Sequence, residues 1–137
     1  MKIERFAGQY RFLSNFYPCN VILDGVSYPS TVNAYQAAKT LDLHERWLFK
    51  VYTAVQAKRA GKKLKLRSDW ESVKLGVMLD LLRKKFAHGA IRDQLLATGD
   101  AELIEGNTWG DTYWGVCNGV GENMLGKLLM QVRAELV

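Results

Sequence analysis

The sequence YPSTVNAYQAAK, residues 28–39, is the stretch from which the fold can be worked out most directly. Its Pro-Ser-Thr opening is typical of a helix start, and the alanine-rich residues after it favour a helix that runs to about Leu41. Immediately before it, residues 20–28 predict a small hairpin, because apolar residues flank the turn sequence Asp24-Gly25. Strands and turns therefore give way to helices at this point.

A helical wheel, drawn at about 100° per residue, divides the predicted helix into two faces. The alanines form a small-residue face that suits close packing, whereas Gln36, Lys39 and Thr40 lie together on a polar face. Val32 falls at the centre of that polar face. Two interpretations remain open: a surface helix with one stray apolar residue, or the lining of a site in which Lys39 is the reactive group.

The rest of the chain is predicted to be mostly helical. Apolar spacing and helix-start signals predict helices over 44–52, 54–60, about 68–86, 90–97 and 124–136. Two short strands are expected, over 101–105 and 112–116, around a glycine-rich loop. The pattern predicts an α+β, helix-dominated single domain covering residues 1–137, with a small antiparallel sheet.

Composition and residue spacing exclude several classes of protein. The 137 residues are 48% hydrophobic and 24% charged, as in an ordinary globular domain. No apolar run approaches the roughly 20 residues of a membrane span, and no secretory signal is visible, so we expect a cytoplasmic protein. The two cysteines and two histidines lack metal-ligand spacing, which predicts buried structural thiols, no zinc site and no cofactor.

A basic run, KRAGKKLKLR at residues 58–67, carries much of the formal net charge of +5. Such a run is usually a solvated face. Alternatively, it supplies salt-sensitive attraction to a phosphate-rich partner, such as a nucleotide or a nucleic acid. The sequence leaves both interpretations open.

The segment EGNTWGDTYWGVCNGVGENMLG, residues 105–126, is a second candidate for chemistry. Its glycines predict tight turns leading into the last helix, whose N-terminus is expected to offer free N–H groups to an anion near Asn123. Asp111 stands among tryptophans and a tyrosine, and apolar surroundings can raise the pKa of a carboxyl group into a range useful for acid–base catalysis. The alternative is a capped turn with core tryptophans.

Eight segments, spread over nearly the whole chain, match the motifs of one known protein family in their order. They are FLSNFYP (12–18), DGVSYPST (24–31), NAYQAAK (33–39), RSDWESVK (67–74), LLRKKFAH (81–88), LLATGDAELIE (95–105), DTYWG (111–115) and GENMLGKLLMQVR (121–133). In this order they resemble the YbiA-like, or NADAR, family. The resemblance implies a small α+β fold and N-glycosidase activity. Family members cleave ribosyl-amine bonds in early riboflavin-pathway intermediates, and others remove ADP-ribose from guanine in nucleic acid.

These two substrate classes are both glycosides of an exocyclic amine, so their anomeric carbon can open to an imine or aldehyde form. A neutral lysine amine can then displace the leaving amine through a Schiff base. Lys39 matches the family lysine, and the resemblance assigns it this role. It also implies two carboxylates for proton transfer, Asp111 and a Glu on the helix of the lysine. The position of that Glu holds Val32, which neither donates nor accepts a proton.

The same resemblance implies a set of substrate-binding positions in the pocket. Trp70 and Trp114 are expected to pack against the base or the sugar. The full set is Ser14, Asn15, Phe16, Tyr35, Gln36, Trp70, Trp109, Tyr113, Trp114, Asn118 and Asn123.

We therefore expect an N-glycosidase that hydrolyses the bond between a ribose anomeric carbon and an exocyclic amine. The basic run favours ADP-ribosylated guanine in nucleic acid as the substrate, over a free phosphorylated ribosylamino-pyrimidine. The alternative from a different class is a binding module for ADP-ribose or nucleotides that is catalytically impaired because of Val32.

Overall fold

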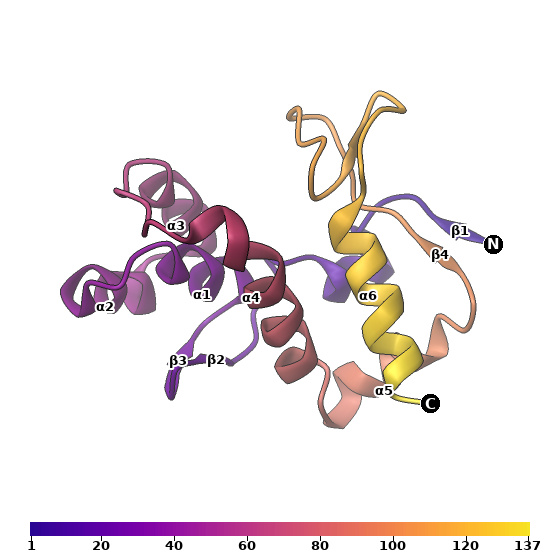
Figure 1. Cartoon of the computed structure of the whole chain (residues 1–137). Coiled ribbons are helices and arrows are strands. Elements are labelled where there is room, and N and C mark those ends of the chain that lie inside the picture. The colour runs from indigo at the N-terminus through magenta and orange to yellow at the C-terminus, as the bar shows by residue number, and fades with distance from the viewer. The chain divides into compact units, whose positions relative to one another are not determined.

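The structure is a computed structural model that describes residues 1–137 (Figure 1). The chain divides into two compact units, each of which is described by itself: unit 1 comprises Met1–Ser14 and Phe86–Val137, and unit 2 comprises Asn15–Lys85. Unit 1 contains β1 (Lys2–Ile3), the 3-10 helix η1 (Gly8–Leu13), α5 (Gly89–Ala97), β4 (Glu102–Leu103), β5 (Gly106–Asn107), β6 (Val116–Cys117) and α6 (Met124–Glu135). Unit 2 contains β2 (Val21–Leu23), β3 (Val26–Tyr28), α1 (Thr31–Ala38), α2 (Leu43–Val51), α3 (Ala54–Gly61) and α4 (Trp70–Lys85).

The expected helix-rich α+β fold is confirmed, and the strands form three separate two-stranded sheets. Only the β2–β3 pair is antiparallel, while β1–β4 and β5–β6 are parallel. The 3-10 helix η1 lies in a segment for which only strands and turns were predicted. No helix combines the length and the apolar character needed to span a membrane. The single-domain assignment stays a prediction.

The hairpin forms as its turn sequence predicts. Val21 pairs with Tyr28 and Leu23 with Val26, so only Asp24 and Gly25 connect the strands. Both turn residues have positive φ, 48° and 80°. This is the type I′ geometry that matches the right-handed twist of a two-residue hairpin.

Helix α1 is the centre of unit 2. All of its residues are buried, and it contacts α2, α3, α4 and both strands of the hairpin. The Ser30 side chain accepts a hydrogen bond from the Asn33 N–H and so caps the helix, as predicted. The helix ends at Ala38 rather than Leu41, because the N–H groups of Lys39 and Thr40 bond three residues back and tighten the last turn.

The buried side chain of Asn33 joins α1 to the end of α2. Its Nδ2 donates to the carbonyl oxygens of Phe49 and Tyr52, both at 2.9 Å. Its Oδ1 accepts from the Ser30 hydroxyl. The amide therefore satisfies carbonyl groups that the C-terminus of α2 leaves without helical partners.

Close backbone approaches fix two further contacts. At the end of α3, a Cβ on Gly61 would collide with Oε1 of Gln36, so glycine lets α3 come close to α1. In unit 1, a Cβ on Gly126 would collide with the carbonyl oxygen of Leu103, where α6 packs against β4. Asn123 supports the second contact, because its Oδ1 accepts from the Glu105 N–H and its Nδ2 donates to the Leu103 carbonyl, both at 2.9 Å.

Replacing Asn33 with Ala should lower the free energy of unfolding by about 2–3 kcal/mol, because buried carbonyl groups lose their hydrogen-bond donor. Urea titration followed by circular dichroism measures the change. The control is Asn20→Ala at an exposed position, which should stay within about 0.5 kcal/mol of wild type. Equal stabilities for the two variants would contradict the linking role of Asn33.

Candidate functional site

The residues predicted to form the site divide between the two units. Those in unit 2 are Asn15, Phe16, Val32, Tyr35, Gln36, Lys39 and Trp70. Those in unit 1 are Ser14, Trp109, Asp111, Tyr113, Trp114, Asn118 and Asn123. We describe each group within its own unit.

Lys39 is the C-cap residue of α1 and its backbone is held on both sides. Its N–H donates to the Gln36 carbonyl at 3.2 Å, and its carbonyl accepts from the Arg67 N–H at 2.8 Å. The side chain is half-buried, and Nζ lies 5.8 Å from the centroid of the Tyr35 ring. The fold therefore holds the amine at a fixed point against an aromatic ring.

The surroundings of Lys39 disfavour its ammonium form. Burial lowers the pKa of the Lys39 amine below its ordinary value, and the positive charges of Lys62 and Lys74 lower it further. A lower pKa leaves a larger share of neutral amine at a given pH, and the neutral form is the nucleophile in Schiff-base chemistry. Lys39 thus has the electrostatic property that its predicted role requires.

Tyr35 and Trp70 form an aromatic pair beside this amine. Their ring centroids are 5.1 Å apart with an interplanar angle of 58°, and both side chains are buried. The pair therefore forms an apolar wall near Lys39. Tyr35 thus contacts both Trp70 and the Lys39 amine, while the substrate-binding roles of the two aromatic residues stay predictions.

Val32 is a buried residue, with 7% of its surface exposed, in the first turn of α1. Its N–H donates to the Asn15 carbonyl at 3.0 Å. The interpretation of this segment as a surface helix with a stray apolar residue is therefore wrong, because packing encloses α1 on all sides. Three buried side-chain atoms lack hydrogen-bond partners in this part of unit 2: Asn15 Oδ1, Thr31 Oγ1 and Gln36 Oε1.

The basic run 58–67 is mostly a solvated surface. Arg59, Lys62, Lys63 and Lys65 are exposed. Two members have partners, since Lys58 Nζ lies 5.5 Å from the ring centroid of Phe16 and Arg67 Nε lies 2.6 Å from Asp69 Oδ1. Because Lys62 also lowers the pKa of Lys39, part of this charge acts within unit 2 itself.

Asp111 in unit 1 organises a turn. Its Oδ1 accepts from the N–H groups of Tyr113 and Trp114 at 3.1 and 3.0 Å. Its own N–H and carbonyl bond to the side chain of Asn107, which is buried. These bonds occupy N–H groups in the segment expected to be a strand, which accounts for strand β6 beginning only at Val116. The capped-turn interpretation is confirmed for the backbone, while catalysis by Asp111 stays a prediction.

The aromatic residues around Asp111 differ in burial from the expected core tryptophans. Trp109 is 58% exposed. Trp114 is half-buried and meets Tyr113 edge-on, with ring centroids 4.8 Å apart. The substrate-binding roles of all three residues remain predictions.

The prediction that free N–H groups at the N-terminus of α6 hold an anion is wrong. The N–H groups of Met124 and Leu125 donate to the carbonyl oxygens of Tyr113 and Trp114, both at 3.0 Å, and so have backbone partners. Asn118 occupies a tight turn between Cys117 and Val120 with a φ of 51°, a conformation that asparagine tolerates better than most residues. Turn geometry thus accounts for the conformation of Asn118, and the bonds to Leu103 and Glu105 account for the position of Asn123. The substrate-binding roles of both residues stay predictions.

Comparison with known proteins identifies the relatives of this chain. A family model described as NADAR domain matches residues 4–137. The chain belongs to the NADAR family. It is 41% identical over 132 residues to N-glycosidase YbiA of Shigella boydii, covering 93% of this chain and 82% of that protein. The NMR structure of the Escherichia coli protein YbiA matches with a TM-score of 0.86 and 37% identity, covering 99% of this chain and 83% of that one.

Another relative is much longer than this chain. The riboflavin biosynthesis protein VVA0006 of Vibrio vulnificus is 39% identical over an alignment of 130 residues, and the match covers 91% of this chain and 35% of that protein. The NADAR domain thus also occurs as part of a larger protein.

Sequence reasoning missed several residues around the predicted NADAR site. It placed Lys62 in the basic run, for which a solvated face and a phosphate-rich partner were both open, and did not connect it with Lys39. It also missed Asn107, which anchors Asp111, and Lys74, which no sequence pattern connects with Lys39. No group of three or more histidine, cysteine or acidic side chains comes together in a way that would hold a metal ion.

Replacing Lys62 with Gln should raise the pKa of Lys39 towards its ordinary value, because one neighbouring positive charge is removed. The measurement is a pH titration of the protein after reductive ¹³C-methylation of its lysines, with the Lys39 signal assigned by its loss in Lys39→Arg. Lys65→Gln removes an exposed charge of the same run and should leave the midpoint unchanged. A Lys39 midpoint that does not move in Lys62→Gln would contradict the electrostatic assignment.

Proposed function

We propose that this chain is an N-glycosidase that uses the Lys39 amine to cleave the bond between a ribose anomeric carbon and an exocyclic amine. The observation that supports the proposal is the position of this amine. It is held at the end of a buried helix, beside Tyr35 and Trp70, where burial and two lysine charges lower its pKa. Relatives that carry the name N-glycosidase support the same reaction class.

The reaction begins when the substrate sugar opens, which leaves an imine between its anomeric carbon and the base nitrogen. The neutral Lys39 amine adds to that carbon, and the base nitrogen leaves as a free amine after it gains a proton. Lys39 is then bound to the sugar as a Schiff base. Water adds to the same carbon and releases the sugar as an aldehyde, which regenerates the lysine amine. The sum consumes one water molecule.

Two steps of this reaction need proton transfer, but this chain lacks one of the two carboxylates that the family resemblance implies. Asp111 is the remaining acidic residue among the family positions, and its Oδ1 already accepts two backbone hydrogen bonds. Val32 stands at the position that the family resemblance assigns to a glutamate. Loss of a positioned acid or base typically lowers a rate by about 10²–10⁴-fold. We therefore propose that this chain converts its substrate slowly.

A phosphorylated ribosylamino-pyrimidine is our first candidate substrate. The Vibrio relative is named a riboflavin biosynthesis protein, which supports a substrate from that pathway. The basic run was the reason to prefer a nucleic acid, but Lys62 within it also acts on the pKa of Lys39. The run therefore has a role that requires no polymer.

ADP-ribosylated guanine is the second candidate. Arg59, Lys63 and Lys65 are exposed on the same stretch, and they supply charge that would attract phosphates. Binding of ADP-ribose without turnover is the remaining outcome, since Val32 removes a proton-transfer group but leaves the aromatic wall in place.

Replacing Val32 with Glu should raise the rate of sugar release by about 10²–10⁴-fold, because it restores a proton-transfer group one turn from Gln36 on the helix of Lys39. Purified wild type and variant are incubated with ADP-ribosylated guanosine and, separately, with the ribosylamino-pyrimidine phosphate. Chromatography with mass spectrometry measures the free sugar.

The matched control is Val32→Gln. Glutamine is close to glutamate in size and is also polar, but it transfers no proton at neutral pH. It should stay close to the wild-type rate. Release of sugar from neither substrate by any of the three proteins would overturn the N-glycosidase proposal. Equal rates for the Glu and Gln variants would contradict the role proposed for position 32.

A further inference from the structure

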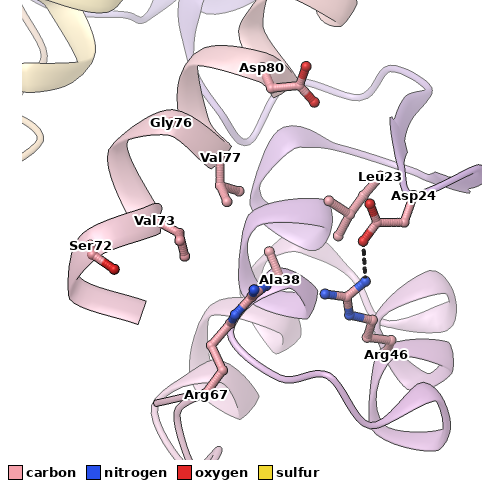
Figure 2. Close-up of a pocket in the computed structure, with 10 residues that line it drawn as sticks. All are labelled: Leu23, Asp24, Ala38, Arg46, Arg67, Ser72, Val73, Gly76, Val77 and Asp80. Carbon is pink, nitrogen blue, oxygen red and sulfur yellow. Dashed lines mark hydrogen bonds and ion pairs between the residues drawn. The ribbon is translucent and has the colours of Figure 1, made fainter. Parts of the chain in front are cut away.

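Unit 2 contains a hollow that the Lys39 side chain does not line. It has a volume of about 460 Å³ and lies where the hairpin turn, α1, α2 and α4 meet (Figure 2). Volumes of this size hold small organic ligands. Two guanidinium groups, those of Arg46 and Arg67, line it.

Arg46 is a buried cation with incomplete pairing. Its Nε donates to the Thr40 carbonyl and its Nη1 to Asp24 Oδ2, both at 2.7 Å. Its Nη2 is buried and has no hydrogen-bond partner. The side chain of Arg46 is 8% exposed, whereas that of its counter-ion Asp24 is 71% exposed. Asp24 also lines the hollow. Its carboxylate is largely open to water, which screens it, so it offsets the buried charge of Arg46 only in part.

Arg67 brings a second positive charge to the same hollow. Its Nε and Nη2 bond to Asp69 at 2.6 and 3.0 Å, which leaves Nη1 uncommitted. In Figure 2 the guanidinium group of Arg67 lies to the left of Ala38 and that of Arg46 to its right. The carboxylate of Asp80 lies at the other end of the hollow and is paired with Lys84 at 2.9 Å. In Figure 2, Asp80 lies farther from the two arginines than Asp24 does.

Gly76 lies on the α4 side of the hollow. It lies inside α4, where glycine costs about 1 kcal/mol relative to alanine. A Cβ at this position would meet no atom within 4 Å, so close packing does not require the glycine. Val73 and Val77 on the same helix, with Leu23 from the hairpin, supply an apolar wall. The hollow thus combines a cationic end with an apolar side.

We propose that this hollow is a binding site for a small phosphate monoester whose organic part has an apolar face. The phosphate lies between the guanidinium groups of Arg46 and Arg67, because paired N–H donors of arginine match phosphate oxygens. It supplies an acceptor for Nη2 of Arg46, which has no partner in the protein. The organic part lies against Val73, Val77 and Leu23. Lys39 is not among the residues that line this site.

Phenyl phosphate is the probe, because it joins a phosphate to an apolar ring. Titration of ¹⁵N-labelled protein should give saturable shifts of the backbone signals of Asp24, Arg46, Arg67 and Gly76, and phenol should give none. Gly76→Leu fills the hollow with a residue that favours helix, so the fold is retained while the affinity falls at least about tenfold. Arg67→Gln removes one charge and should weaken binding by about tenfold.

The matched control is Arg59→Gln, which removes an exposed arginine outside the hollow and should leave the affinity within about twofold. Arg46 is not replaced, because its side chain also holds Thr40 and Asp24. Three results would overturn the proposal: the absence of saturable shifts at the hollow, unchanged affinity in Gly76→Leu, or equal weakening in Arg59→Gln and Arg67→Gln.

Discussion

The complete burial of helix α1 is the constraint on which unit 2 depends. A helix that buries the side chain of Asn33 needs hydrogen-bond partners for that amide inside the protein. Asn33 finds its partners at the end of α2, which fixes two helices against each other. The same burial places the amine of Lys39 at the last turn, where it is partly withdrawn from water. The chemistry proposed for this amine is therefore a consequence of how the helix packs.

Positively charged side chains have two distinct roles in unit 2. Near Lys39, two further lysines lower the pKa of the amine and so favour the form that attacks a sugar carbon. In the hollow between the hairpin and α4, Arg46 is buried with a guanidinium nitrogen that lacks a partner, which suits an anionic ligand. A run of basic residues thus need not mean a nucleic-acid surface, since its members act on different groups within the fold.

The sequence predicted local features well because those features depend on neighbouring residues. The Asp24-Gly25 turn has the conformation that its two residues favour, and the serine cap of α1 forms as its sequence indicates. Burial was predicted poorly, because it depends on packing partners distant in the chain. A helical wheel showed polar residues on one side of α1, but it contains no information that other helices cover that side. Asp111 was open to two interpretations for the same reason, since its bonds to Asn107 appear only in three dimensions.

The most direct test of this account is covalent trapping at Lys39. The Val32→Glu protein is mixed with the ribosylamino-pyrimidine phosphate and sodium borohydride, and the digested peptides are analysed by mass spectrometry. The account predicts a sugar adduct on Lys39 and its loss in a second protein that also carries Lys39→Arg, which keeps the positive charge. Sugar release without any adduct on Lys39, or the same adduct yield in the Lys39→Arg protein, would contradict it.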